Sequence, residues 1–171
     1  MGHEEHEARA RAEGPVPIAC GIITISDTRT PETDTSGAAI RAALSNAGHN
    51  VVRYTLVRDE PAEIVALVQA YTVAGCKLLI TNGGTGIARR DSTIEAIETL
   101  LEKRLPGFGE LFRMLSYQEI GPAAMLSRAT AGVYNNSLIF CLPGSTAAVR
   151  LALATLIIPQ AAHLVWETLR Q

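Results

Sequence analysis

Three short apolar stretches constrain the fold of this chain more than any other feature. Ile18–Ser26, Val51–Val57 and Cys76–Thr81 are rich in β-branched residues and end in turn formers, as is typical of buried strands. Helical apolar spacing separates them, from about Asp34 to Gly48 and from Pro61 to Gly75. This β-α-β-α-β order predicts a largely parallel sheet covered by helices. The carboxyl ends of the strands then share one edge, where open α/β sheets bind ligands.

The second half of the chain adds helices to this pattern. Ser92 followed by Glu95 is a capping box, which predicts a helix from Ser92 to about Lys103. A further helix is expected over Pro106–Tyr117. A last helix follows the LPGST segment, and we expect Pro159 to kink or divide it.

A hairpin is expected between these helices. Met125–Gly132 and Ser137–Cys141 flank the segment Val133–Asn136. Asn135 and Asn136 tolerate the positive φ angles of a hairpin turn. The expected fold is therefore an α/β domain with a mostly parallel sheet and a small antiparallel hairpin.

The distribution of charge indicates a partner. The chain has 171 residues, enough for one domain, and 19% of them are charged, against about 25% in an average soluble protein. Six charges lie in residues 1–16, which we expect to form a disordered or mobile leader. Residues 17–171, the expected single domain, hold 13 charges of each sign, about 17% of their length. We therefore expect part of the surface to be buried in a homo-oligomer.

Composition also excludes several classes of protein. A net charge of -2 with 15 Lys and Arg gives no basic field to attract nucleic acid. The longest uncharged apolar run, Leu151–Ile158, ends at Pro159 and is shorter than the roughly 18 residues of a membrane span. Three cysteines cannot all pair with one another, and the first residues lack the apolar stretch of a signal peptide. We expect no nucleic acid, no membrane and a cytoplasmic location.

A glycine-rich segment follows the third strand and is the strongest local signal. It reads Asn82-Gly83-Gly84-Thr85-Gly86. Glycines allow the backbone to approach an anion closely, and successive N–H groups there can form an anion-binding nest. The spacing matches neither standard nucleotide fingerprint. A phosphate cradle and a simple tight turn are both consistent with this segment, and its place at the ligand edge favours the cradle.

Three carboxylates converge on the same edge. Asp27 and Asp59 each follow a strand, and Asp91 comes shortly after the glycine segment. Singly, each is consistent with a helix cap or a turn. Together they indicate a magnesium ion, which is usually held by one or two carboxylates plus substrate phosphates. Arg89 and Arg90 could neutralise phosphate charge or simply be solvated.

A second glycine segment, Pro143-Gly144-Ser145-Thr146, joins the last strand to the last helix. Ser145 is expected to cap that helix. The helix start could also bind a phosphate or carboxylate. The two interpretations are compatible.

Four segments in this order and spacing resemble one family: TNGGTGIARRDST, PGFGELFR, MLSRATAG and LPGST. Ile18–Gln171 is similar to the MogA/MoaB proteins, the molybdopterin adenylyltransferase family of molybdenum cofactor biosynthesis, whose domain also occurs in gephyrin. LPGST stands where MogA-type members have LPGxP, which indicates the MoaB-type branch.

The resemblance implies a three-layer α/β/α domain that forms a homotrimer or homohexamer. It implies that the terminal phosphate of molybdopterin attacks the α-phosphate of Mg-ATP, releasing pyrophosphate, and that a downstream molybdenum-insertion protein is a possible partner. Asp91 matches the essential acid of the RDxT segment and Asp59 its partner acid; both would hold magnesium or position substrate. The remaining positions match binding segments: Gly83, Gly84, Thr85 and Gly86 in the phosphate loop, and Ser26, Asp27, Glu110, Ser127, Pro143, Gly144 and Ser145 in the pocket.

Two other functions are consistent with the sequence. A non-catalytic molybdopterin-binding or assembly protein is one, since not every MoaB-type member is an active adenylyltransferase. A nucleotide pyrophosphatase of the same fold is the other, although such chains usually carry a second domain.

Overall fold

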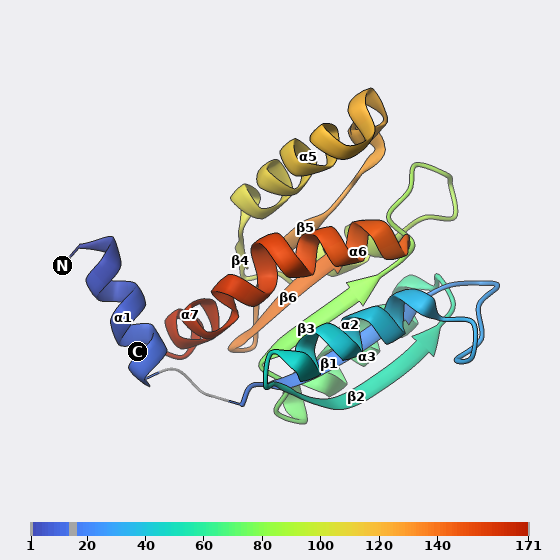
Figure 1. Cartoon of the computed structure of the whole chain (residues 1–171). Helices are drawn as coiled ribbons and strands as arrows, with labels where there is room; N and C mark the ends of the chain where they lie inside the picture. The colour runs from blue at the N-terminus through green and yellow to red at the C-terminus, as the bar shows by residue number, and fades with distance from the viewer. Residues whose placement is uncertain (1, 14–16, 171) are drawn as a thin grey trace.

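A six-stranded sheet forms the centre of the computed structural model, which describes residues 2–13 and 17–170 (Figure 1). The spatial order is β2-β1-β3-β6-β5-β4. The strands are β1 (Ala19–Ile25), β2 (Asn50–Val57), β3 (Leu78–Asn82), β4 (Lys103–Arg104), β5 (Thr130–Tyr134) and β6 (Ser137–Leu142). Strands β2, β1, β3 and β6 are parallel, while β5 runs antiparallel to both β6 and β4. The predicted mostly parallel sheet with an antiparallel hairpin is confirmed.

Helices cover both faces of the sheet, as the three-layer expectation requires. They are α2 (Thr35–Asn46), α3 (Pro61–Val73), α4 (Thr93–Glu98), α5 (Pro106–Ile120), the 3-10 helix η1 (Gly121–Leu126), α6 (Thr146–Ala152), the π-helix η2 (Leu153–Ile157) and α7 (Ile158–Leu169). One apolar cluster joins the sheet to α2, α5, α6 and α7, and a second joins the opposite face to α3 and α4.

Alternate side chains of each buried strand contribute to the two apolar clusters. In β1, Cys20 and Ile22 belong to the first cluster, whereas Ile23 and Ile25 belong to the second. Successive strand side chains point to opposite faces, so a strand buried on both sides has no polar face. The unbroken apolar runs of the sequence are explained by this two-sided burial.

The turn between β5 and β6 confirms the predicted hairpin and corrects its start. Asn135 and Asn136 have φ angles of 48° and 54°, the left-handed conformation expected there. Met125 belongs to η1 rather than to a strand, and β5 begins only at Thr130. Pro122 lies in the first turn of η1, where the missing N–H costs no hydrogen bond.

The helix after the glycine turn differs from its prediction, and for the last helix one of the two expected outcomes is excluded. Helix α4 ends at Glu98 rather than near Lys103, and the side chain of Ser92 does not cap it. The last helix is not divided, because Thr146–Leu169 is helical throughout. Pro159 instead follows the π-helical turn η2. A proline has no N–H to donate to the preceding turn, which accounts for the irregular hydrogen bonding there.

This last helix is also long and apolar enough to cross a membrane, judged by length and composition alone. Its residues Val149, Leu153, Ile157 and Val165 are almost completely buried in the first apolar cluster. A core helix passes the same test of length and composition as a membrane span. We attribute its apolar character to packing against the sheet.

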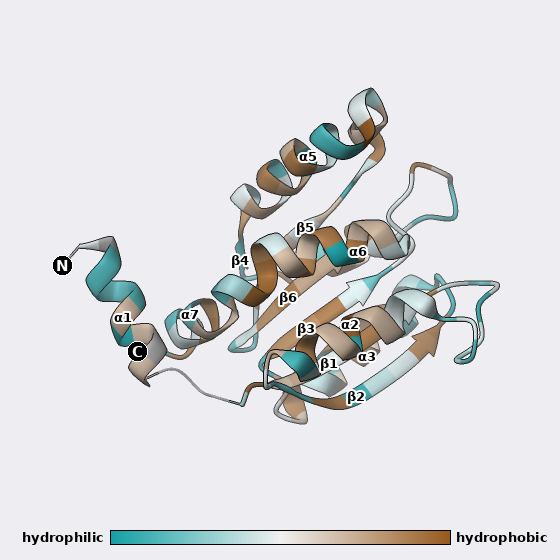
Figure 2. Cartoon of the chain, viewed as in Figure 1, coloured by the Kyte–Doolittle hydropathy of each residue, from teal (hydrophilic) through white to brown (hydrophobic). Residues whose placement is uncertain are grey.

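Within the expected leader, His3–Glu13 forms helix α1 (Figure 1). Figure 2 shows α1 as mostly hydrophilic. It contacts α7: the rings of His6 and Trp166 meet edge to face at 6.3 Å, and Gln160 Nε2 donates to Glu7 Oε1 at 3.0 Å. Mobility of this helix and a domain boundary at residue 17 stay predictions.

We predict that His49 makes stability depend on pH. Its side chain is buried just before β2, its Nδ1 accepts from the N–H of Ile18 at 3.4 Å, and burial lowers its pKa below the ordinary 6.5. As pH falls below 6.5, the unfolded chain takes up a proton that the folded chain refuses, so folding stability falls until the folded pKa is passed. Urea unfolding should show that His49→Asn, which keeps an acceptor but cannot titrate, gains on the wild type between pH 7.5 and pH 5.5. A constant difference between the two proteins would contradict this.

Candidate functional site

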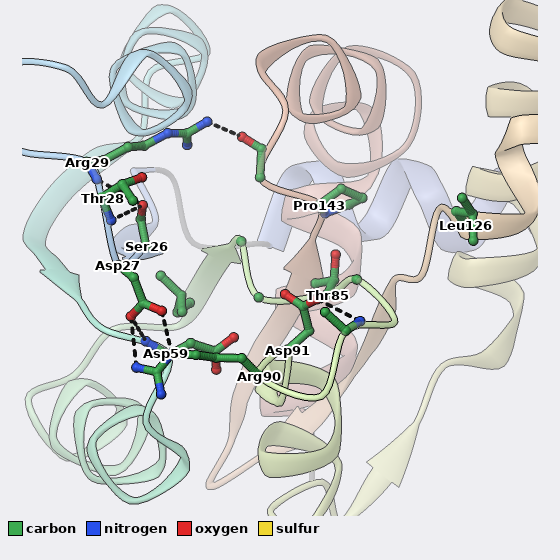
Figure 3. A pocket seen from close by; sticks show the side chains of 16 residues that line it. Ser26, Asp27, Thr28, Arg29, Asp59, Thr85, Arg90, Asp91, Leu126 and Pro143 are labelled. Atoms are coloured by element: carbon green, nitrogen blue, oxygen red, sulfur yellow. Dashed lines mark hydrogen bonds and ion pairs between the residues drawn. The ribbon is translucent and has the colours of Figure 1, made fainter.

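A cavity of about 580 Å³ opens at the carboxyl ends of the parallel strands (Figure 3). The segments that follow β1, β2, β3 and β6 line it, and Leu126 at the end of η1 contributes from the α5 side. The cavity therefore lies at the edge that the strand order predicted. Asp27, Asp59 and Asp91 all line it, together with the glycine segment.

The glycine segment is a tight turn with no room for side chains. Gly83 and Gly84 have φ angles of 101° and 65°. A Cβ on Gly83 would overlap the carbonyl oxygen of Ile25, and one on Gly84 would overlap Asp59 Oδ2 and Thr93 Oγ1. The turn is anchored by the Gly83 N–H, which donates to the carbonyl of Leu142 at 3.0 Å. The tight-turn interpretation is therefore correct, and phosphate binding by the same turn stays a prediction.

Asp59 is held by the segment that follows this turn. Its side chain is buried, and its Oδ1 accepts from the hydroxyl of Ser92 at 2.8 Å while Oδ2 accepts from the Ser92 N–H at 3.3 Å. The hydroxyl of the capping-box serine is thus used at the site, which is why it does not cap α4. The hydrogen bonds to the Asp59 carboxylate beside the glycine turn thus come from neutral donors of Ser92.

Asp91 approaches the glycine segment from the other end. Its Oδ2 accepts from the N–H of Ala88 at 3.0 Å, and an ideal Cβ on Gly86 would lie 2.6 Å from the same oxygen. Only glycine at position 86 lets the carboxylate lie this close to the backbone. Asp59 and Asp91 therefore flank the same turn, as the sequence predicted.

Asp27 is balanced differently, because an arginine neutralises it. Arg90 Nε donates to Asp27 Oδ2 at 2.5 Å and Nη2 donates to Oδ1 at 3.1 Å, while Nη2 also reaches Glu60 Oε1 at 2.9 Å. The hydrogen bonds from Arg90 are the largest cause that holds the pKa of Asp27 below its usual range. The N–H of Asp59 donates to Asp27 Oδ1 at 3.3 Å. Asp27 thus connects the ends of β1 and β2 to the segment after β3.

A second arginine connects the end of β1 to the segment after β6 (Figure 3). Arg29 Nη2 donates to the carbonyl oxygen of Gly144 at 2.9 Å, and the Ser36 hydroxyl donates to the same oxygen at 2.8 Å. Ser26 Oγ accepts from the N–H groups of Thr28 and Arg29 at 3.3 and 3.0 Å. These bonds position Pro143 and Gly144 at the cavity wall.

Three candidate residues do not line the cavity. Ser145 caps α6 by accepting from the N–H of Ala148 at 3.2 Å, which confirms the helix cap expected of it. Glu110 is exposed on α5, and Ser127 follows η1. Conversely, Arg29 and Leu126 line the cavity although the sequence did not single them out. The position of Arg29 two residues after Asp27 is a signal that could have indicated it.

The acids fit a magnesium ion that arrives with a phosphate ligand. Among residues 2–13 and 17–170, no three His, Cys, Asp or Glu side chains group closely enough to hold a metal without help. Magnesium typically needs one or two carboxylates plus substrate phosphates, and Asp59 and Asp91 flank one turn in this way. Thr93 Oγ1, buried beside Gly84, has no hydrogen-bond partner in the described structure, so the turn also keeps an unused polar oxygen.

Comparison with known proteins shows the family to which the chain belongs. Residues 21–163 match a family described as the probable molybdopterin binding domain. The chain is 50% identical to molybdenum cofactor biosynthesis protein B of Bacillus subtilis, over 98% of this chain and 97% of that protein. It is 49% identical to the protein of the same name from Halalkalibacterium halodurans, over 99% of each chain.

Solved structures of the same family superpose on this chain. A crystal structure of molybdenum cofactor biosynthesis protein B superposes with a TM-score of 0.89 at 49% identity, covering 93% of this chain and 100% of that one. The tungsten cofactor synthesizing protein MoaB from Pyrococcus furiosus gives a TM-score of 0.83 at 37% identity, over 90% and 98% of the two chains. The resemblance to the MoaB-type branch is confirmed.

We predict that Gly84→Ala destabilises the protein by about 1–3 kcal/mol, because alanine must adopt a positive φ and its Cβ overlaps Asp59 and Thr93. Gly107→Ala is the matched control, since a Cβ there, in the first turn of α5, meets no atom within 4 Å. It should leave stability unchanged or raise it by up to about 1 kcal/mol. Urea unfolding at neutral pH measures both, and equal stability of Gly84→Ala and the wild type would refute the close packing of this turn.

Proposed function

The chain belongs to the family of probable molybdopterin binding domains, and from that premise we propose that it transfers the adenylyl group of Mg-ATP to molybdopterin and releases pyrophosphate. Its relatives at 47–50% identity are molybdenum cofactor biosynthesis proteins, so this chain acts in molybdenum cofactor biosynthesis. The adenylylation step is the finer proposal. A cytoplasmic location and a downstream molybdenum-insertion protein as partner belong to the same proposal.

One observation carries the proposal: the same cavity is lined by the glycine-rich turn and by the two acids that flank it, Asp59 and Asp91. Gly83 and Gly84 line the cavity with backbone alone, where a phosphate could lie, and Asp59 and Asp91 would supply the carboxylates for its metal. Neither acid is paired with an arginine or lysine among the ion pairs of the described residues. Both therefore stay available to a cation.

The chemistry needs positioning more than a protein nucleophile. An oxygen of the molybdopterin phosphate forms a bond to the α-phosphorus of ATP, and the bond from that phosphorus to the β-phosphate oxygen breaks. Pyrophosphate carries away the electron pair. The attacking oxygen is already anionic, so no general base has to remove a proton. Transfer of this kind depends on alignment of the two reactants and on charge neutralisation.

The described residues divide this work between two sides of the cavity. Magnesium, when bound with ATP, would neutralise phosphate charge and favour pyrophosphate as a leaving group. Asp59 and Asp91 would hold it, and the turn from Gly84 to Gly86 would bind phosphate through backbone N–H groups. Arg29 and Gly144 form the opposite wall, where the second substrate would lie.

We predict that Asp91→Asn lowers adenylylation about 100-fold or more, because an amide cannot replace an anionic ligand to magnesium. Incubation of purified protein with molybdopterin and Mg-ATP, followed by chromatography of the product and of pyrophosphate, measures the rate. Glu63→Gln, an exposed acid on α3 outside the cavity, is the control and should match the wild type.

The same assay separates the competing functions. Product formed by Asp91→Asn at the wild-type rate would remove Asp91 from the mechanism. Tight binding of molybdopterin by the wild type with no turnover of ATP would instead establish the non-catalytic binding protein.

We also propose that the protein forms a homotrimer or homohexamer. Six exposed large apolar side chains, here called the α5 patch, lie on α5 and η1: Leu111, Met114, Tyr117, Ile120, Met125 and Leu126, each 47–81% exposed. A contiguous apolar patch on a domain this poor in charge indicates an interface. The patch extends along α5 and η1 and reaches the cavity at Leu126, so a second copy seated on it would also cover one side of the site.

Met114→Glu is expected to shift the protein from oligomer toward monomer, because a charge buried at an apolar interface costs far more than the lost contact. Light scattering coupled to size exclusion at micromolar concentration measures the mass. Val73→Glu is the control, since Val73 is 80% exposed at the end of α3, on the opposite face of the sheet. A monomeric wild type would refute the oligomer.

A further inference from the structure

Arg90 lies where two cavities meet. It lines the main cavity and also a second one of about 420 Å³, formed with Arg89, Glu60, Pro61 and Ser92. Asp59 likewise lines both. The side chain of Arg90 and the backbone that carries it therefore form part of the wall between the two cavities.

The charge of Arg90 is balanced entirely by protein acids. Its guanidinium bonds both oxygens of Asp27 and one oxygen of Glu60, at 2.5 to 3.1 Å. The two acids and the arginine are each between 37% and 55% exposed. Exposed ion pairs in water contribute little net stability, so these bonds can be exchanged at small cost.

These ion pairs tie the segment after the glycine turn to the rest of the sheet. Ala88 and Asp91 bond each other, inside the segment. Arg90 reaches outward instead, to Asp27 after β1 and Glu60 after β2. A change of partner from Asp27 to another anion would therefore detach the segment that carries Asp91 from the end of β1, while Glu60 and the Ser92–Asp59 hydrogen bonds still hold it to the end of β2.

A polyphosphate in the main cavity would compete directly for this guanidinium. Arg29 and Arg90 are the two basic residues that line the cavity, against three aspartates. Arg29 donates to a neutral carbonyl and lies 3.8 Å from the buried Asp34. The planar fork of Arg90, already used on a carboxylate, suits phosphate oxygens equally well.

We propose that Arg90 is an exchangeable positioning residue: a bound polyphosphate replaces Asp27 as its partner, so that Asp27 opposes nucleotide binding in the empty site. The identity of the anion as the triphosphate of ATP rests on the proposed function. Asp27 then lowers the affinity for a polyphosphate, because the ligand has to displace it from Arg90. A ligand without a polyphosphate leaves the Asp27–Arg90 ion pair intact.

The exchange predicts a change in anion affinity that would not follow if Asp27 had only a structural role. Asp27→Asn removes the competitor and should tighten binding of magnesium triphosphate about three- to tenfold, whereas Arg90→Gln should weaken it. Removing a negative charge also favours an anion in a general way. That general effect does not need Arg90, so it persists when Arg90 is replaced.

Isothermal titration calorimetry with inorganic triphosphate and magnesium tests this in a double-mutant cycle of Asp27→Asn and Arg90→Gln, with thermal unfolding as a check on folding. The tightening caused by Asp27→Asn should be at least about threefold larger when Arg90 is present than when it is glutamine. Arg90→Lys, which keeps the charge but not the fork, should recover only part of the wild-type affinity.

Equal tightening in both backgrounds would overturn the exchange, as would weaker binding by Asp27→Asn or no binding of triphosphate by the wild type. The adenylylation assay run in parallel separates the two proposals. If product forms but the effects of the two substitutions on triphosphate affinity are additive, the exchange is rejected and the adenylyltransferase proposal stands. If the two effects are coupled but no product forms, the exchange stands and the adenylyltransferase proposal is rejected.

Discussion

The site depends on how closely the turn after β3 passes the ends of β1 and β2. At Gly83 the backbone touches the carbonyl of Ile25, and at Gly84 it touches the carboxylate of Asp59, so any Cβ would push these segments apart. The parallel pairing of β1 with β2 and β3 brings the three strand ends to one edge. The glycines then allow the closest approach that the backbone can make, and the cavity forms beside it.

The three aspartates at this edge have different roles because their charges are balanced differently. Asp27 is neutralised by a guanidinium, which lowers its pKa. Asp59 and Asp91 accept only neutral donors, a serine hydroxyl and backbone N–H groups. A cation is therefore attracted to the last two, whereas in the proposed exchange an anion gains Arg90 by replacing Asp27. In the proposed mechanism, one cluster of acids would provide both a metal site and a control on anion entry.

Competition between local and tertiary bonds explains where sequence patterns failed. The capping box at Ser92 predicted a cap, but the hydroxyl bonds Asp59, and α4 is short. Pro159 was expected to kink or divide the last helix; burial of Val149 through Val165 against the sheet keeps the helix continuous, and the irregularity is confined to the π-helical turn before the proline. A local hydrogen bond is worth about 1 kcal/mol, less than the burial of several large side chains.

The sequence by itself determined the strand and helix order, the sheet edge at which the cavity lies, and the glycine turn with its flanking acids. Those features follow from residue periodicity and from steric limits that act over a few neighbours. Only the tertiary structure decided which charges meet. Arg29 bonds Gly144 across 115 residues and Arg90 bonds Asp27 across 63, and Glu110 and Ser127 stay outside the cavity. Such pairs depend on how separate segments fold beside one another, and no pattern of near neighbours records that distance.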